Sequence, residues 1–245
     1  MIDQGFDTSP RIFGNHRSLF RNEYPSGSIY CLGIEKSELY NKSVYDIGIG
    51  AGGSLYETAQ HNAENPTKAI HYIGVDVLLQ MPDKSLSEND KQIKEELRQA
   101  VEKFPSLFQN SNVLYGIPQP TNSFDYVISH YGMPEYTNNP TQVVNIIFEM
   151  VRVAKEKVVF TGGWLDEDFE DKLKAGEYIF GGAAAVGGFE LFSFKLKKLM
   201  EELKSIDVHT HRHSLANVHL DTTHKDLKKL EELRKNILNR IEEFS

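Results

Sequence analysis

The fold of this chain is decided by ten residues, Val44-Tyr45-Asp46-Ile47-Gly48-Ile49-Gly50-Ala51-Gly52-Gly53. They read as a short apolar strand that runs into a glycine-rich turn, with an acid two residues before the first glycine. Glycine has no Cβ, so this turn can bend sharply and approach a ligand closely, and the helix that follows offers N–H donors. The order of strand, turn and helix predicts a site for a nucleotide-like cofactor.

Two classes of cofactor fit the glycine spacing. Gly48, Gly50 and Gly53 match the Gly-x-Gly-x-x-Gly pattern of a dinucleotide fold, and Asp76 closes a second apolar strand, where it could hold ribose hydroxyls. Asp46 favours the other class, because a carboxylate beside the turn repels an anionic pyrophosphate. It suits a cofactor that has no phosphate and carries an amino group and a sulfonium. A dehydrogenase is therefore the least favoured interpretation.

The chain resembles the class I S-adenosylmethionine-dependent methyltransferases. Their first motif reads acid-x-Gly-x-Gly-x-Gly, and it is matched by Asp46, Gly48, Gly50 and Gly52. The resemblance continues through Asp76 and through the segments 118–129 and 152–161, and it covers about half the chain, residues 44–163.

Strand and helix patterns alternate along the chain, which predicts a parallel sheet covered on both faces. Strands are expected near 43–48, 70–76, 112–116, 124–129, 156–161 and 206–215, and helices near 52–63, 88–104, 140–154, 189–205 and 221–244. The resemblance implies an α/β fold, a three-layer α/β/α sandwich around a seven-stranded, mostly parallel sheet. An N-terminal helical segment and a candidate lid after the fifth strand would complete it.

The length of 245 residues and the absence of a linker rich in Ser, Gly or Pro predict a single domain. Within it we expect an N-terminal cap segment at 1–40 and a cofactor-binding core at 41–163. The lid, the remaining strands and a C-terminal helix would occupy 164–245.

Ligands of an open α/β sheet gather at the carboxyl ends of its strands. By resemblance, the methionine end of the cofactor would lie at the glycine turn, the ribose at the end of the second strand and the adenine beyond the third. The predicted cofactor-binding residues are Asp46, Ile47, Gly48, Gly50, Gly52, Asp76, Val77, Gly116, Ile117, Ser129 and His130. A loop cap is the alternative role for Asp76.

The acceptor substrate is expected beside the end of the fourth strand. His130 is the catalytic candidate, since it could take a proton from the acceptor, although it could equally hydrogen-bond only the cofactor or a backbone carbonyl. Tyr131, Glu135 and Tyr136 are the substrate candidates. The Asn/Asp-Pro-Pro-Tyr sequence with which the family grips a planar amino group is absent from this strand end. By the resemblance, its absence disfavours methylation of the amino groups of nucleic-acid bases.

His209, His211 and His213 alternate along a predicted strand, so their side chains share one face. Such a row could bind a transition metal, form a polar strand face or contact the substrate. We predict no metal, because the polar face is the commonest of these arrangements.

The composition limits the partners. A formal net charge of −8 argues against a nucleic-acid partner, since a phosphate backbone requires a basic face. A single cysteine, Cys31, permits no internal disulfide and indicates a cytoplasmic location. No apolar run approaches the ~18 residues of a membrane span, and no secretory signal is present at the N-terminus.

The C-terminal helix is predicted to carry an apolar stripe, which would either pack into the core or support a homodimer. Its members are Leu227, Leu230, Leu233, Ile237, Ile241 and Phe244.

Together these features predict a cytoplasmic enzyme that transfers a methyl group from S-adenosyl-L-methionine to an oxygen or nitrogen of a small or medium-sized acceptor molecule. The product of the cofactor would be S-adenosyl-L-homocysteine. Two alternatives remain open. An aminopropyl transferase-like enzyme would use Glu135 and the acids at 166–168 to bind a polyamine, and a non-catalytic regulatory module would contact a partner through residues 181–188.

Overall fold

The computed structural model describes residues 19–20, 28–130, 132–134, 137, 139–161, 195–214 and 217–244, with the backbone alone at 211–214. The strands are β1 (Ser43–Ile47), β2 (His71–Asp76), β3 (Phe108–Asn110), β4 (Phe124–Ser129), β5 (Ala154–Thr161), β6 (His209–Ser214) and β7 (Asn217–Asp221). The helices are α1 (Ser28–Cys31), α2 (Gly53–Glu64), α3 (Glu88–Lys103), α4 (Pro140–Val153), α6 (Leu196–Lys204) and α7 (Leu227–Leu238).

The strands form one seven-stranded sheet in the order β3-β2-β1-β4-β5-β7-β6. Strands β1 to β5 run parallel. At one edge β7 pairs antiparallel with β5, and β6 pairs antiparallel with β7, so β7 alone runs against the other strands. The predicted α/β fold with a mostly parallel sheet of seven strands is confirmed.

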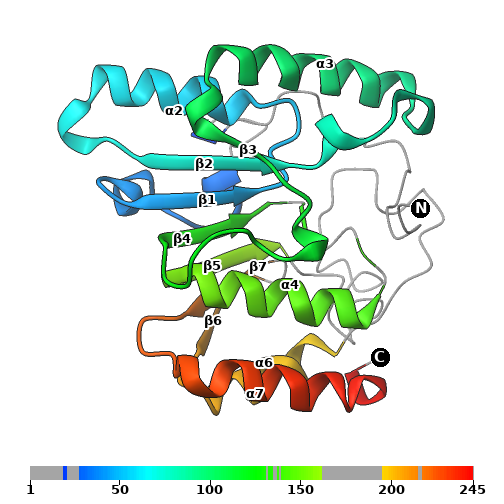
Figure 1. Ribbon diagram of the computed structural model, residues 1–245. Coiled ribbons are helices and arrows are strands. Elements are labelled where there is room, and N and C mark those ends of the chain that lie inside the picture. Colours follow the sequence, from blue (N-terminus) through cyan, green and yellow to red (C-terminus); the bar gives the residue numbers. More distant parts are fainter. Residues whose placement is uncertain are drawn as a thin grey trace.

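Helices cover both faces of this sheet (Figure 1). Helices α4, α6 and α7 pack on one face, and α1, α2 and α3 on the other. The side chains of β1 alternate between the two cores, with Tyr45 and Ile47 in the first and Val44 in the second. This alternation is the two-residue period of a strand, and it directs Asp46 toward the face that α2 covers.

Three of the covering helices, α3, α4 and α7, begin at residues whose side chains cap them. The side chain of Ser87 accepts from the Asp90 N–H before α3, and that of Asn139 accepts from two amides at the start of α4, which opens with Pro140. Asp226 caps α7 in the same way. The predicted boundaries of α3 and α4 are therefore met within one residue.

The third strand lies four residues earlier than predicted, at Phe108–Asn110 rather than near 112–116. Residues Val113–Tyr115 form a 3-10 turn instead, because the side chain of Asn112 accepts a hydrogen bond from the Leu114 N–H. A local side-chain bond of this kind competes with strand pairing.

The C-terminal region also differs from the prediction. The expected helix over 221–244 begins only at Leu227, since residues Asn217–Asp221 form β7, which pairs with both β5 and β6. The alternation of polar and apolar residues in Asn-Val-His-Leu-Asp was the signal for this strand. Of the helix expected over 189–205, the described part is α6, and the candidate lid lies outside the described residues.

The C-terminal stripe packs inside the chain. Leu230, Ile237 and Phe244 are buried in the core on the α4 side, Leu233 and Ile241 pack against it, and Leu227 is exposed. Core packing of the stripe is confirmed, so most of its apolar surface is not available to a second copy of the chain.

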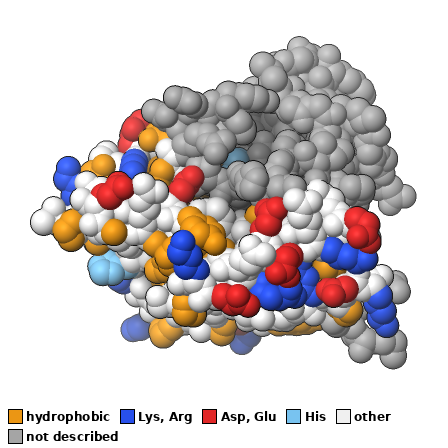
Figure 2. Space-filling view, turned by 90° about the horizontal axis from the view of Figure 1, so that it is seen from above, with side chains coloured by type: hydrophobic (Ala, Val, Ile, Leu, Met, Phe, Trp, Pro, Cys, Tyr) orange, Lys and Arg blue, Asp and Glu red, His pale blue; other side chains and the backbone are white. Residues whose placement is uncertain are grey.

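The side of the molecule seen in Figure 2 carries acidic and basic side chains interspersed, with apolar side chains between them. Ion pairs such as Lys91 with Glu88 and Arg98 with Glu95 lie along α3. No helix in the described ranges has both the length and the apolar character that crossing a bilayer requires.

Candidate functional site

Three glycines of the turn after β1 adopt left-handed conformations. Gly48, Gly50 and Gly52 have φ angles of +78°, +60° and +79°, and α2 begins at the next residue, Gly53. Other residue types are strained at such angles, which explains why glycine recurs at every second position. The turn is anchored to the neighbouring strand, since the Gly48 N–H donates to the Val75 carbonyl at 2.7 Å.

Asp76 fastens this turn from the end of β2. Its side chain is only 4% exposed, one carboxylate oxygen accepts from the Gly50 N–H and the other from the Leu78 N–H, both at 2.9 Å. Asp76 thus caps the loop that follows β2, which is the alternative role predicted for it. Each carboxylate oxygen has a second lone pair, so the same group retains the capacity to accept from ribose hydroxyls. Val77 follows directly and opens a 3-10 turn.

Asp46 lies beneath the turn, 2% exposed. Its Oδ2 accepts a hydrogen bond of 2.7 Å from the Tyr72 hydroxyl, which also lies 2.8 Å from the Ser54 hydroxyl in the first turn of α2. A phenol has one proton, so Tyr72 donates to the carboxylate and accepts from Ser54. Neither Tyr72 nor Ser54 was predicted, because an apolar strand pattern gives no sign that a tyrosine hydroxyl will meet a carboxylate.

Replacing Tyr72 with phenylalanine should lower the free energy of unfolding by about 1–2 kcal/mol, because a buried carboxylate oxygen loses its donor. Urea denaturation of the variant and the wild type measures this change. Tyr30→Phe is the matched control on a tyrosine that is only partly buried, and we expect it to have little effect. Equal stability of Tyr72→Phe and wild type would contradict the role of the hydroxyl.

Ser129 contacts the end of β1, and His130 contacts α1. The Ser129 hydroxyl, 1% exposed, donates to the Ile47 carbonyl at 3.3 Å. His130 is buried, and its Nδ1 lies 3.2 Å from the hydroxyl of Ser28. The backbone of Gly132 also lies close to the end of β1. Only glycine fits there, since a Cβ on residue 132 would lie 2.5 Å from the Ile47 carbonyl oxygen.

Asn217 is a further buried polar residue at this edge of the sheet, and sequence reasoning missed it together with β7. It pairs with Thr161, the last residue of β5, and it is 6% exposed. Its side-chain nitrogen donates to the Cys31 carbonyl, which sets the orientation of the amide. The amide oxygen has no hydrogen-bond partner among the described residues.

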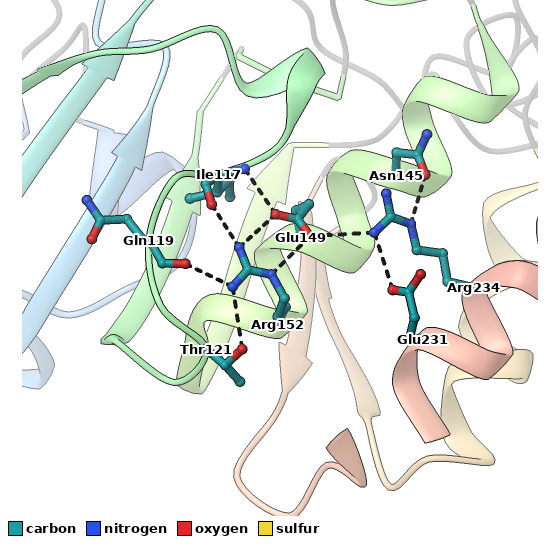
Figure 3. Close-up of polar contacts among 8 residues, drawn as sticks. All are labelled: Ile117, Gln119, Thr121, Asn145, Glu149, Arg152, Glu231 and Arg234. Carbon is teal, nitrogen blue, oxygen red and sulfur yellow. Dashed lines mark hydrogen bonds and ion pairs between the residues drawn. The ribbon is translucent and has the colours of Figure 1, made fainter. Parts of the chain in front are cut away.

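Gly116 and Ile117 do not directly follow β3 as predicted, because the strand ends at Asn110 and a 3-10 turn intervenes. The backbone of Ile117 is bound to α4 instead (Figure 3). Its N–H donates to Glu149 Oε2 at 3.0 Å, and its carbonyl accepts from Arg152 at 2.8 Å. These contacts join the loop before β4 to α4.

Burial raises the pKa of Glu149, but the hydrogen bonds from Arg152 and from the Ile117 N–H outweigh it, and the pKa lies below its ordinary 4.5. Glu149→Gln should therefore destabilise the protein by about 1–2 kcal/mol near neutral pH. A depressed carboxyl pKa contributes stability above the unfolded pKa, and this contribution is lost as the pH falls through the folded pKa. The difference between variant and wild type should shrink below pH 4.5.

Urea denaturation as a function of pH tests this expectation. Glu231→Gln is the control, since the Glu231 side chain is 60% exposed and its ion pair should contribute little. A stability difference for Glu149→Gln that does not depend on pH would contradict it.

Several predicted residues lie outside the described residues: Tyr131, Glu135 and Tyr136 of the substrate candidates, and the acids at 166–168. The side chains of His211 and His213 are likewise not described. Among the described side chains, no group of three His, Cys, Asp or Glu residues is arranged to hold a metal ion.

The strand order, the helices on both faces and the glycine turn after the first strand are those of the class I S-adenosylmethionine-dependent methyltransferase fold. Among solved structures, the chain is similar to the PH0226 protein from Pyrococcus horikoshii OT3, with a TM-score of 0.52 and 16% identity over 89% of this chain and 98% of that one. At this identity the likeness defines the fold alone.

Two further solved structures are similar to the chain at lower TM-scores. One is an S-adenosylmethionine-dependent methyltransferase from Aquifex aeolicus, with a TM-score of 0.40 and 14% identity over 74% of this chain and 81% of that one. Another is magnesium protoporphyrin IX methyltransferase from Synechocystis PCC 6803, whose structure contains bound S-adenosylmethionine, with a TM-score of 0.43 and 14% identity over 79% of this chain and 75% of that one. No protein-family model matches the chain, and no curated protein matches it significantly.

Proposed function

We propose that this protein is a methyltransferase that transfers the methyl group of S-adenosylmethionine to an oxygen or nitrogen of a small or medium-sized acceptor. The observation that carries the proposal is the turn between β1 and α2, where left-handed glycines lie between two buried carboxylates, Asp46 and Asp76. The carboxylate of Asp46 favours a cationic ligand at the turn and disfavours a pyrophosphate, and that of Asp76 suits the ribose of either class of cofactor.

The residues of the turn fit this cofactor. A Cβ at Gly50 would meet no atom within 4 Å, so there is open space beside the turn. We assign the methionine end to Asp46, Ile47 and the turn, and the ribose to Asp76 and Val77. We assign the adenine to residues 111–113, which directly follow β3, in preference to Gly116 and Ile117. The cofactor supplies an electrophilic methyl group on a cationic sulfur, and the chain supplies its orientation.

The acceptor is assigned to the adjacent ends of β4 and β5. Ser129 and His130 lie at the first of these ends, and Asn217 lies beside the second. In-line displacement at a methyl group requires no protonation of the leaving sulfur, so alignment of the acceptor should supply most of the acceleration. His130 can accept the proton that the acceptor oxygen or nitrogen gives up. With Cys31 as its single cysteine, the protein suits the reducing cytosol.

Two measurements test the proposal. Calorimetry should show binding of S-adenosylhomocysteine and no comparable binding of NADH. Incubation with methyl-labelled S-adenosylmethionine and a panel of small hydroxyl, carboxyl and amine acceptors should then transfer the label. Binding of NADH in place of S-adenosylhomocysteine would overturn the cofactor assignment, and cofactor binding without transfer to any acceptor would favour the regulatory module.

A further inference from the structure

A cavity lies where α4, α7 and the loop before β4 meet, and no residue of the glycine turn lines it. Its volume is about 380 Å³, within the range of small-molecule sites, and it is bounded by residues 113–116, by Asn145 and Glu149 of α4 and by Arg234 of α7. Its lining shares Gly116 with the predicted cofactor set and Val113 with the segment assigned above to the adenine. The polar groups of this cavity come from α4 and α7, two helices far apart in sequence (Figure 3).

The carboxylate of Glu149, which lines this cavity, already accepts hydrogen bonds within the chain. Arg152 donates to both of its oxygens, from Nε at 3.0 Å and from Nη2 at 2.8 Å, and the Ile117 N–H adds a third bond. This two-point pairing compensates the charge of the carboxylate. Glu149 therefore has little capacity left to accept from a ligand or to neutralise a second cation.

Arg234 is a cation with only loose compensation. Its Nη1 lies 3.5 Å from both Glu149 Oε1 and Glu231 Oε2, longer than the ~2.7–2.9 Å of a strong charge-assisted hydrogen bond. Its Nη2 donates to no partner among the described residues, and in Figure 3 this nitrogen has no dashed line. One edge of the guanidinium is thus open to a ligand.

Asn145 contributes a donor beside this edge. Its side-chain oxygen accepts from Arg234 Nε at 2.9 Å, which identifies the other side-chain atom as the nitrogen (Figure 3). That nitrogen donates to no group in the described part of the chain. The open atoms of Arg234 and Asn145 are both donors, and together they favour a ligand with acceptor oxygens.

Tyr115 supplies an aromatic surface at the same cavity. Its side chain is 76% exposed, the most exposed large hydrophobic residue of the described chain. An exposed tyrosine ring offers a flat apolar contact at low entropic cost. A ring that stacks on Tyr115 would also lose its own contact with water.

We propose that this cavity binds a small aromatic monocarboxylate, with the carboxylate on Arg234 Nη2 and the Asn145 amide and the ring on Tyr115. The planar fork of an arginine matches the geometry of a carboxylate. A phosphate dianion fits less well, because the Glu231 carboxylate lies 3.5 Å from the same guanidinium and repels two negative charges more strongly than one. This site does not depend on methyl transfer.

The test is ¹⁹F NMR of 4-fluorobenzoate with the full chain. We expect saturable line broadening with the wild type, and at least about tenfold weaker binding with Arg234→Gln. Arg240→Gln is the matched control, since it removes the same charge from the chain just after α7, where Arg240 pairs with Glu202 outside the cavity. Glu231→Gln should tighten binding severalfold by removing a repelling carboxylate, and Tyr115→Ala should weaken it.

Three outcomes would overturn the proposal. They are the absence of saturable binding to the wild type, equal affinities of Arg234→Gln and Arg240→Gln, and tighter binding of phenyl phosphate than of 4-fluorobenzoate. Circular dichroism of each variant shows whether a loss of binding reflects a loss of fold. Because Arg234 lies on the surface of α7 with a quarter of its side chain exposed, we expect Arg234→Gln to stay folded.

Discussion

Asp76→Asn should weaken binding of S-adenosylhomocysteine by about 100-fold, or ~2.7 kcal/mol. In the folded chain this carboxylate accepts from two backbone amides, those of Gly50 and Leu78, and we assign its remaining lone pairs to the ribose hydroxyls. An asparagine has one acceptor oxygen and turns an NH₂ group toward the second amide. The substitution therefore removes a ribose contact and loosens the glycine turn at once. Calorimetry measures the affinity.

The control for this variant is Asp125→Asn, at the opposite end of the sheet. Asp125 accepts from the Ser43 N–H and from the Ser43 hydroxyl, both at 2.7 Å, so its side chain also holds a neighbouring strand. We expect Asp125→Asn to lose stability and keep its affinity for S-adenosylhomocysteine. If Asp76→Asn bound the cofactor as the wild type does, the ribose assignment would be wrong.

Gly52→Ala should cost about 2–5 kcal/mol of unfolding free energy. A Cβ on Gly52 would lie 2.9 Å from the Cβ of Ala100 and 3.1 Å from Leu97 Cδ1, both on α3. The Ala100 Cβ is held directly by the helix backbone, so it cannot move aside without the helix. The left-handed φ of +79° adds about 1–2 kcal/mol of strain for any residue with a side chain. Chemical denaturation measures the loss.

Comparison with Gly50→Ala separates the cost of steric overlap from the cost of backbone strain. Its φ of +60° is also left-handed, but a Cβ there would meet nothing within 4 Å. We expect a stability loss of about 1–2 kcal/mol from backbone strain alone. Because the added methyl would occupy the space beside the turn, we also expect weaker binding of S-adenosylhomocysteine. Equal destabilisation by the two alanine variants would contradict the close packing of the turn on α3.

The candidate site was predictable where a local pattern carries the chemistry. The strand, the glycine turn and the acid at the end of the next strand are recognisable from residue types and spacing, and Asp76 does lie against the turn that contains Gly50. The partners of Asp46 were not predictable. Tyr72 and Ser54 reach it from two different elements, and no spacing rule relates them to the carboxylate.

The sequence by itself determined the alternation of strands and helices, because hydrophobic periodicity, glycine turns and capping residues act over a few neighbouring positions. Only the tertiary structure decided which edge positions pair and which charged groups meet. The third strand moved to Phe108–Asn110 because Asn112 caps a turn, and Asn217–Asp221 became a strand because β5 offered an open edge. The meeting of Arg234 with Asn145 and Glu149 joins residues nearly 90 positions apart, a relation that packing of α7 on α4 creates and no local pattern records.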